Sequence, residues 1–209
     1  MQNVPYSFII RRLATILAVV ILSLSLTAAF TGILLSFYYE PTAGGAYNSL
    51  KLIKSEINYG WLIQRIHQIA GNGLIAASLI EIVVMFLGEK FRPSWLTAWI
   101  SGILLTLTAI ALGWTAMLLD WTQLGYWRFT LELGTIEAIP LIGSQLRDIL
   151  TGGGAINTVT VAHFYTLHSY ILSISALILA IIHLAGVLLQ EKEEKQALKE
   201  TEAAVSFSE

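Results

Sequence analysis

Two pairs of residues with proton- or metal-binding side chains recur at helical spacing in apolar parts of the chain. Glu81 follows His67 by 14 residues, and His183 follows His168 by 15. At ~100° per residue, an α-helix returns position 81 to within about 40° of position 67, and position 183 to within about 60° of position 168. Each pair therefore lies on one face of its helix, with its members ~21 to 22 Å apart along the axis.

The composition places these residues in a membrane. Of the 209 residues, 56% are hydrophobic and only 12% are charged. Four apolar stretches are long enough to cross a hydrocarbon core of ~30 Å as helices. They are Leu13 to Tyr38, Trp61 to Leu87, Leu96 to Leu119, and Val159 to Leu189. We expect an all-α integral membrane protein, a four-helix bundle with both termini on one side.

Charged residues outside the four stretches predict the orientation and the domain boundary. Lysines and arginines are more numerous on the terminal side, which favours cytoplasmic termini. That side has Arg11, Arg12, Lys90, Arg92, Lys192, Lys195 and Lys199, and the other has Lys51, Lys54, Arg65, Arg128 and Arg147. The chain becomes abruptly charged after Leu189, so residues 1–189 are predicted to form the transmembrane domain and 190–209 a charged soluble tail.

The connections between the stretches differ in length and character. Residues 40–60 contain Pro41, Gly44 and Gly45 and predict a folded loop. Residues 120–157 are longer and include many apolar positions, so short helices lying at the membrane interface are expected there. These helices should be broken at Pro140 and at the three glycines 152–154. The formal net charge of −2 argues against a nucleic-acid partner.

The two residue pairs should face each other across the bundle. The second and fourth stretches both begin at the non-terminal face, so His67 and His168 share one depth and Glu81 and His183 share the other. Two imidazoles that face each other inside a helical bundle can bind iron from both sides of a porphyrin. A bis-histidine haem is therefore the leading hypothesis. The alternative is structural, because a histidine can also cap a helix, bond a carbonyl or join two helices.

Five local strings, in this order, carry a family resemblance. They are Phe37-Tyr38-Tyr39-Glu40-Pro41-Thr42, Asn58-Tyr59-Gly60-Trp61-Leu62-Ile63, Gly125-Tyr126-Trp127, Glu137-Ala138-Ile139-Pro140-Leu141-Ile142-Gly143, and Phe164-Tyr165-Thr166-Leu167-His168. With them, residues 13–189 resemble the cytochrome b/b6 family, and the 15-residue step resembles the b6 type. The resemblance implies a haem-b electron carrier in a cytochrome bc/b6f-like or other electron-transport complex, with membrane lipid, membrane quinone and other subunits as partners.

The resemblance also assigns roles to individual residues. His67 and His168 match the axial ligands of one haem b. His183 matches one ligand of a second haem, whose other ligand position is occupied by Glu81, so binding of a second haem stays open. The family's small residues beside the haem edges are here Ala18, Gly32, Gly102 and Ala116.

Several positions depart from the family pattern. Gln68 and His163 replace arginines that neutralise haem propionates, and Arg65 is the candidate to compensate. The segment Asp120-Trp121-Thr122-Gln123 differs from the family's Pro-Trp-Asp-Gln at the quinol-side entrance. Ile16 replaces the cysteine that anchors an extra haem in b6. The chain has no cysteine at all, which excludes a thioether-attached haem.

Glu81 has three possible roles. An ionisable side chain at this depth is costly and marks a functional site with a nearby partner. It could pair directly with His183 in a haem-free slot, it could stand opposite a haem that His183 binds alone, or it could itself bind iron or relay a proton. For the whole chain, the alternative to electron transfer is a non-catalytic structural or assembly subunit of a photosynthetic or respiratory membrane complex.

Overall fold

The computed structural model describes residues 6–88 and 95–206. Its elements are α1 (Tyr6–Ser36), α2 (Ala46–Ser55), α3 (Gly60–Leu87), α4 (Trp95–Leu119), α5 (Gln123–Glu137), α6 (Gly143–Thr151), α7 (Thr158–Thr166), the π-helical turn η1 (Leu167–Leu172) and α8 (Ser173–Ser206). Four helical stretches are long and apolar enough to cross a membrane: Arg12–Ser36, Gly60–Leu87, Trp95–Leu119 and Thr158–Glu200. This confirms the predicted four-helix membrane bundle. Lys90 and Arg92, used to predict the orientation, lie outside the described residues.

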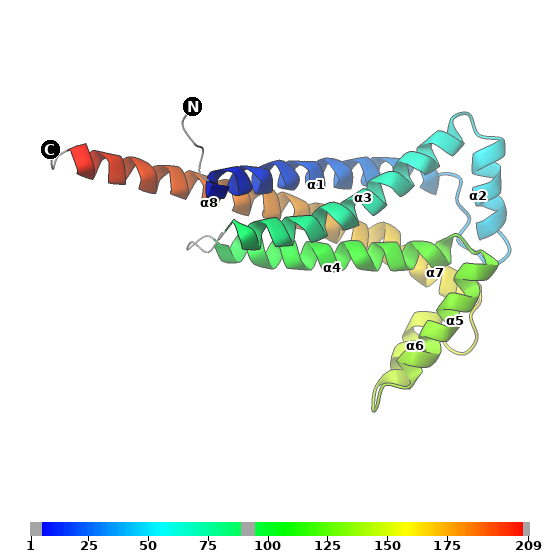
Figure 1. Ribbon diagram of the computed structural model, residues 1–209. Coiled ribbons are helices and arrows are strands. Elements are labelled where there is room, and N and C mark those ends of the chain that lie inside the picture. Colours follow the sequence, from blue (N-terminus) through cyan, green and yellow to red (C-terminus); the bar gives the residue numbers. More distant parts are fainter. Residues whose placement is uncertain (1–5, 89–94, 207–209) are drawn as a thin grey trace.

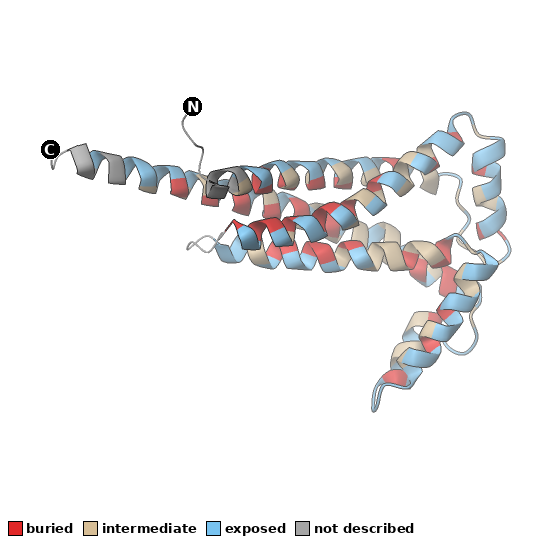
Figure 2. Ribbon diagram, viewed as in Figure 1, coloured by how far each residue is buried: buried red, intermediate tan, exposed pale blue. Residues whose placement is uncertain are grey.

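The spans form one elongated bundle (Figure 1). Helix α1 packs against α3 and α8, and α4 packs against the same two helices. The start of α1 and the charged end of α8 lie at the same end of the bundle. Buried positions face inward and exposed ones outward (Figure 2). Large apolar side chains such as Phe30, which is 65% exposed, therefore cover the surface that a lipid bilayer would contact.

The core consists of three apolar clusters along the bundle. The terminal-end cluster includes Ala14, Ala18, Met85, Ala98 and Val187, the middle cluster includes Ile21, Leu74, Leu105 and Ala180, and the loop-end cluster includes Leu118, Phe129 and Phe164. Many of these residues are alanines. Small side chains allow membrane helices to approach closely, and packing then stabilises the bundle without a hydrophobic driving force from water.

Helices α4 and α8 pack closely at Gly186. A Cβ atom on this glycine would lie 2.8 Å from the backbone nitrogen of Ala98 and 3.0 Å from its Cα. Backbone atoms cannot rotate away, so Gly186→Ala should push the helices apart and destabilise the protein by about 1–3 kcal/mol. Gly71→Ala on α3 is the matched control, because a Cβ there meets nothing within 4 Å. Thermal denaturation in detergent would compare them, and equal melting temperatures would contradict this account.

The fourth span contains a π-helical turn at His168. The backbone N–H of Ser173 donates to the carbonyl of His168, five residues earlier. A π turn inserts one extra residue into a helix. The 15-residue step from His168 to His183 therefore has nearly the register of a 14-residue step, about 40° from alignment. The turn explains how unequal spacings on α3 and α8 can present two matching pairs of side chains.

A folded loop was predicted between the first and second spans, but the connection between α1 and α3 contains helix α2. Ala46 and Ile53 of α2 are buried, and the helix ends against the start of α3. A Cβ on Gly60 would lie 2.0 Å from the carbonyl oxygen of Ile53, so only glycine fits this contact. Tyr59 precedes it in the left-handed conformation, with φ of 61°.

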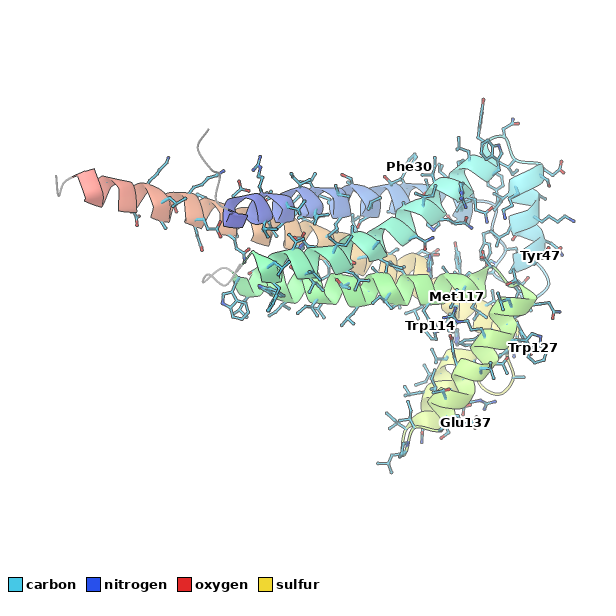
Figure 3. The ribbon with its side chains drawn as sticks, viewed as in Figure 1. Phe30, Tyr47, Trp114, Met117, Trp127 and Glu137 are labelled. Atoms are coloured by element: carbon cyan, nitrogen blue, oxygen red, sulfur yellow. The ribbon has the colours of Figure 1, made fainter. Side chains whose placement is uncertain are left out.

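Helices α5 and α6 form an arm that projects from the loop end of the bundle (Figure 1). They correspond to the helices predicted between the third and fourth spans, and the breaks fall at Pro140 and Gly152 as expected. Trp114 of α4 lies where the arm meets the bundle (Figure 3). Its indole N–H donates to Glu132 of α5 at 2.6 Å, and Arg128 donates to the same carboxylate at 3.0 Å. The bond from Trp114 fixes α5 to the bundle, and the bond from Arg128, which lies within α5, holds the carboxylate in place.

Candidate functional site

His67 and His168 lie opposite each other inside the loop-end half of the bundle. His67 comes from α3 and His168 from η1, and their ring centres are 6.4 Å apart with the planes inclined by 61°. The ring of His67 also lies against Gly32 of α1. A Cβ atom at Gly32 would lie 3.1 Å from Cε1 of His67, so a larger residue there would displace the imidazole.

Backbone and side-chain acceptors fix the tautomer of His67. Its Nδ1 lies 3.0 Å from the carbonyl oxygen of Ala28. A carbonyl can only accept, so Nδ1 carries the proton and donates. The hydroxyl of Thr31 lies 3.1 Å from the same nitrogen. In the neutral ring, the free lone pair is therefore on Nε2.

The ring of His168 is oriented in an equivalent way, by a hydrogen bond to a residue of α4. Its Nδ1 lies 2.8 Å from Oγ1 of Thr115. The single hydroxyl proton of Thr115 has backbone acceptors at Ala111 and Leu112, at 2.9 and 3.0 Å, so Oγ1 accepts from His168. The neutral His168 ring then also has its lone pair on Nε2. A fixed Nδ1–H with a free Nε2 is the state that metal-bound histidines show.

Glu81 and His183 face each other in the terminal half of the bundle. Oε1 of Glu81 and Nε2 of His183 are 3.5 Å apart, and both side chains are 2% exposed or less. Nδ1 of His183 donates to the carbonyl of Ala98 at 2.9 Å, and its ring packs on Gly102, where a Cβ would lie 2.9 Å from Cε1. Because Nδ1 of His183 is bonded to Ala98, only Nε2 is available, and the carboxyl of Glu81 faces that nitrogen.

The predicted propionate-neutralising residues lie in different surroundings. Arg65 is exposed, and two helix positions separate it from His67, which places the two side chains on nearly opposite faces of α3. His163 is exposed and its Nδ1 lies 3.2 Å from the carbonyl of Ile149. Gln64, one turn before His67, is instead buried, and its Oε1 has no hydrogen-bond partner among the described residues. The compensating role of Arg65 stays a prediction.

The segment Asp120 to Gln123 forms the turn between α4 and α5. Trp121 has φ of 46°, and Thr122 caps α5 by accepting from the backbone N–H of Gly125 at 3.1 Å. The phenol of Tyr39 donates to the carbonyl of Leu119 at 2.8 Å. Burial, with a smaller contribution from the carboxylate of Asp120, raises the pKa of Tyr39 above its ordinary value. The phenol therefore keeps its proton and fastens the end of α1 to this turn.

The family model described as cytochrome b/b6/petB matches residues 1–192. The chain belongs to the cytochrome b/b6 family. Cytochrome b6 of Acaryochloris marina is 33% identical over 153 residues, which cover 73% of this chain and 71% of that protein. Cytochrome b6 of Synechococcus elongatus is also 33% identical, over 154 residues with the same coverage. Family membership implies a membrane electron-transfer protein with b-type haem.

A solved structure extends the comparison to three dimensions. A chain of a hyperthermophilic respiratory complex III matches with a TM-score of 0.69 and 27% identity, over 89% of this family member and 48% of that chain. This cytochrome b/b6 family member thus spans about half the length of the complex III chain.

The sequence reasoning missed the residues that orient the histidines. The hydroxyls of Thr31 and Thr115 lie within hydrogen-bond distance of Nδ1 of His67 and His168. For His183, the partner of Nδ1 is the backbone carbonyl of Ala98. A signal was present, because each threonine immediately precedes a small residue already singled out, Gly32 or Ala116. These residues come from α1 and α4, so the contact depends on how the helices are rotated relative to each other.

Proposed function

We propose that this chain binds one haem b between His67 and His168 and carries single electrons in a membrane complex. The observation that carries the proposal is the state of the two rings. Both keep Nδ1 in a hydrogen bond and leave Nε2 available. The ring spacing agrees with this role: with bonds of about 2 Å to each imidazole, two rings on one metal hold their centres roughly 6 Å apart, against 6.4 Å here.

The surrounding residues suit a buried porphyrin. Gly32 leaves room beside His67, and apolar side chains of the middle and loop-end clusters keep water away. Haem with two imidazole ligands supplies one-electron transfer. The chain's own contribution is to hold the two rings at fixed depth, to orient them through Ala28 and Thr115, and to exclude solvent. Without cysteine, the chain offers no thioether attachment.

We propose that Glu81 and His183 close the second level of the bundle instead of holding a second haem. Nε2 of His183 and Oε1 of Glu81 approach to 3.5 Å, and this contact offsets part of the cost of burying the two polar groups at such depth. Electrons then have no second haem on which to cross the membrane, which argues against ordinary bifurcated quinol oxidation. Exchange with membrane quinone would take place from the His67 and His168 level, within a cytochrome bc- or b6f-like complex whose other subunits are separate chains.

The proposed cellular arrangement rests on the charge distribution. The terminal side of the bundle has the larger number of lysines and arginines, so we propose cytoplasmic termini in a bacterial inner or thylakoid-type membrane. The segment after Leu189 continues as part of α8, and we propose that this charged helix lies outside the bilayer as a soluble tail.

The role of Thr115 gives a prediction about haem affinity. Thr115→Val removes the acceptor for Nδ1 of His168 while preserving shape, so the apparent haem affinity should fall roughly 10- to 100-fold. Thr108→Val is the matched control, because Thr108 lies on the same helix, is half-buried, and donates its hydroxyl to the carbonyl of Leu104. Haem titration of the apoprotein followed by absorbance measures both. Equal affinities for the two variants would rule out the orienting role.

Electron exchange with quinone can be tested directly. The purified protein, reconstituted with haem and oxidised, is mixed with a reduced short-chain quinol under anaerobic conditions. The appearance of the reduced b-type absorption band is the expected result, and it should be absent in His168→Ala. A haem-loaded protein that dithionite reduces but quinol does not would exclude quinol as the donor. A protein that binds no haem would instead favour the structural or assembly role.

A further inference from the structure

A basic groove lies between α1 and α8 at the terminal end of the bundle. It has a volume of about 630 Å³ and is lined by Arg12, Thr15, Leu188, Glu191, Lys192, Lys195, Gln196 and Lys199. Four of these side chains are cationic and one is a carboxylate. The groove lies far from His67 and His168, since α8 passes the start of α1 here and continues beyond it (Figure 1).

Glu191 holds two of the cationic side chains of this groove in place. Its carboxylate accepts from Arg12 at 2.8 Å and from Thr15 at 2.9 Å, and it lies 2.9 Å from Nζ of Lys195. One carboxylate therefore serves two cations and ties α1 to α8. No ion pair is recorded for Lys192 or Lys199 within the described residues, so the groove keeps an excess of positive charge.

The helical phase of α8 concentrates this charge on one side. At ~100° per residue, Lys192, Lys195 and Lys199 fall within about 60° of one another. By the same arithmetic, Glu193, Glu194 and Glu200 fall on other sides of the helix. The segment is acidic in total, yet it presents a basic stripe toward Arg12.

The groove lies where two apolar runs meet charged sequence. Arg12 directly precedes the apolar run that begins at Leu13, and on α8 the apolar run ends at Leu189; lipid headgroups contact a membrane helix at such boundaries. Directly beside the cations, Ile16 is 52% exposed and Leu188 is 48% exposed. A ligand of this surface must be anionic at one end and apolar at the other, which describes a phospholipid better than a free phosphate ion.

We propose that this groove binds the phosphate headgroup of an anionic phospholipid, with the acyl chains lying along the exposed apolar faces of α1 and α8. Lys192 and Lys199 contact the headgroup, while Arg12 and Lys195 are held in place by Glu191. The proposal is independent of the haem.

Native mass spectrometry of the full chain in detergent tests this, with dioleoylphosphatidylglycerol and dioleoylphosphatidylcholine as probes. The wild type should prefer phosphatidylglycerol, and Lys192→Gln/Lys199→Gln should weaken its binding roughly 10- to 30-fold. The matched control is Lys51→Gln/Lys54→Gln, which removes two exposed lysines of α2 at the opposite end of the bundle. It should leave the preference unchanged.

Three results would overturn the proposal. The wild type could bind both lipids equally, or the two double variants could lose the same affinity. Inorganic phosphate alone could bind in the groove as tightly as phosphatidylglycerol, which would make it a phosphate site and not a lipid site. Circular dichroism of each variant checks that its helices are intact, and Lys192→Arg/Lys199→Arg, which keeps the charge, should retain phosphatidylglycerol binding.

Discussion

His67→Ala and His168→Ala are each expected to abolish the low-spin b-type haem spectrum of the purified protein. Each variant removes one of two imidazoles whose ring centres are 6.4 Å apart, and the remaining ring offers only one axial bond. The apolar slot around it supplies no replacement ligand, because Gly32, Ala28 and Thr31 bring no second metal-binding nitrogen to the site. Absorbance of the reduced and oxidised protein, normalised to polypeptide, measures the loss.

His163→Ala is the control for this pair. His163 is exposed, and its ring bonds the carbonyl of Ile149 outside the proposed haem site. This variant should retain a low-spin haem, although it also removes an imidazole. Retention of a low-spin spectrum in both His67→Ala and His168→Ala would refute the proposed ligands.

Glu81→His is expected to raise the haem content from one to two per polypeptide. His183 already has its Nδ1 fixed by Ala98 and its Nε2 directed at position 81. Gly102 leaves space beside its ring, as Gly32 does for His67. A histidine at position 81 would therefore complete a second bis-histidine pair, at the same helical phase as the first. Pyridine haemochrome analysis gives the haem content.

The space in the second-level slot is tested separately from the missing ligand. Ala18 of α1 is fully buried near the second level, so the double variant Glu81→His/Ala18→Gly widens the slot by one methyl group. Glu81→Gln, which supplies no imidazole, should stay at one haem. If neither histidine variant gains a haem, the second level is closed by helix packing and not by the missing ligand.

The helix arithmetic predicted which side chains meet. Steps of 14 and 15 residues were enough to pair His67 with His168 and Glu81 with His183, because α-helical geometry is nearly invariant and the second and fourth spans run in the same direction from the same face. The motif strings predicted the family, which the comparisons show. The bounds of the second and third spans also agreed to within one residue, whereas α1 begins at Tyr6 and α8 continues to Ser206, because a helix can extend beyond its apolar stretch.

Contacts between side chains on different helices could not be predicted from the sequence. The hydroxyl of Thr115 reaches His168 only because α4 is rotated in one particular way against the fourth span. The π turn at His168 could not be separated from a regular helix by composition, and only the unequal spacing hinted at it. Helix α2 was missed because its flanking glycines and Pro41 outweighed the apolar spacing of Ala46, Leu50 and Ile53, which has the period of a helix.

The most direct test of the central claim is the number and type of haems per polypeptide in the purified wild-type protein, by pyridine haemochrome together with reduced-minus-oxidised spectra. The proposed structure predicts one haem b per chain with a low-spin, bis-imidazole spectrum. Two haems would show that His183 binds iron and that Glu81 does not close the second level, and a single high-spin haem would contradict bis-imidazole ligation by His67 and His168. No haem at all would contradict an electron-transfer role for this chain.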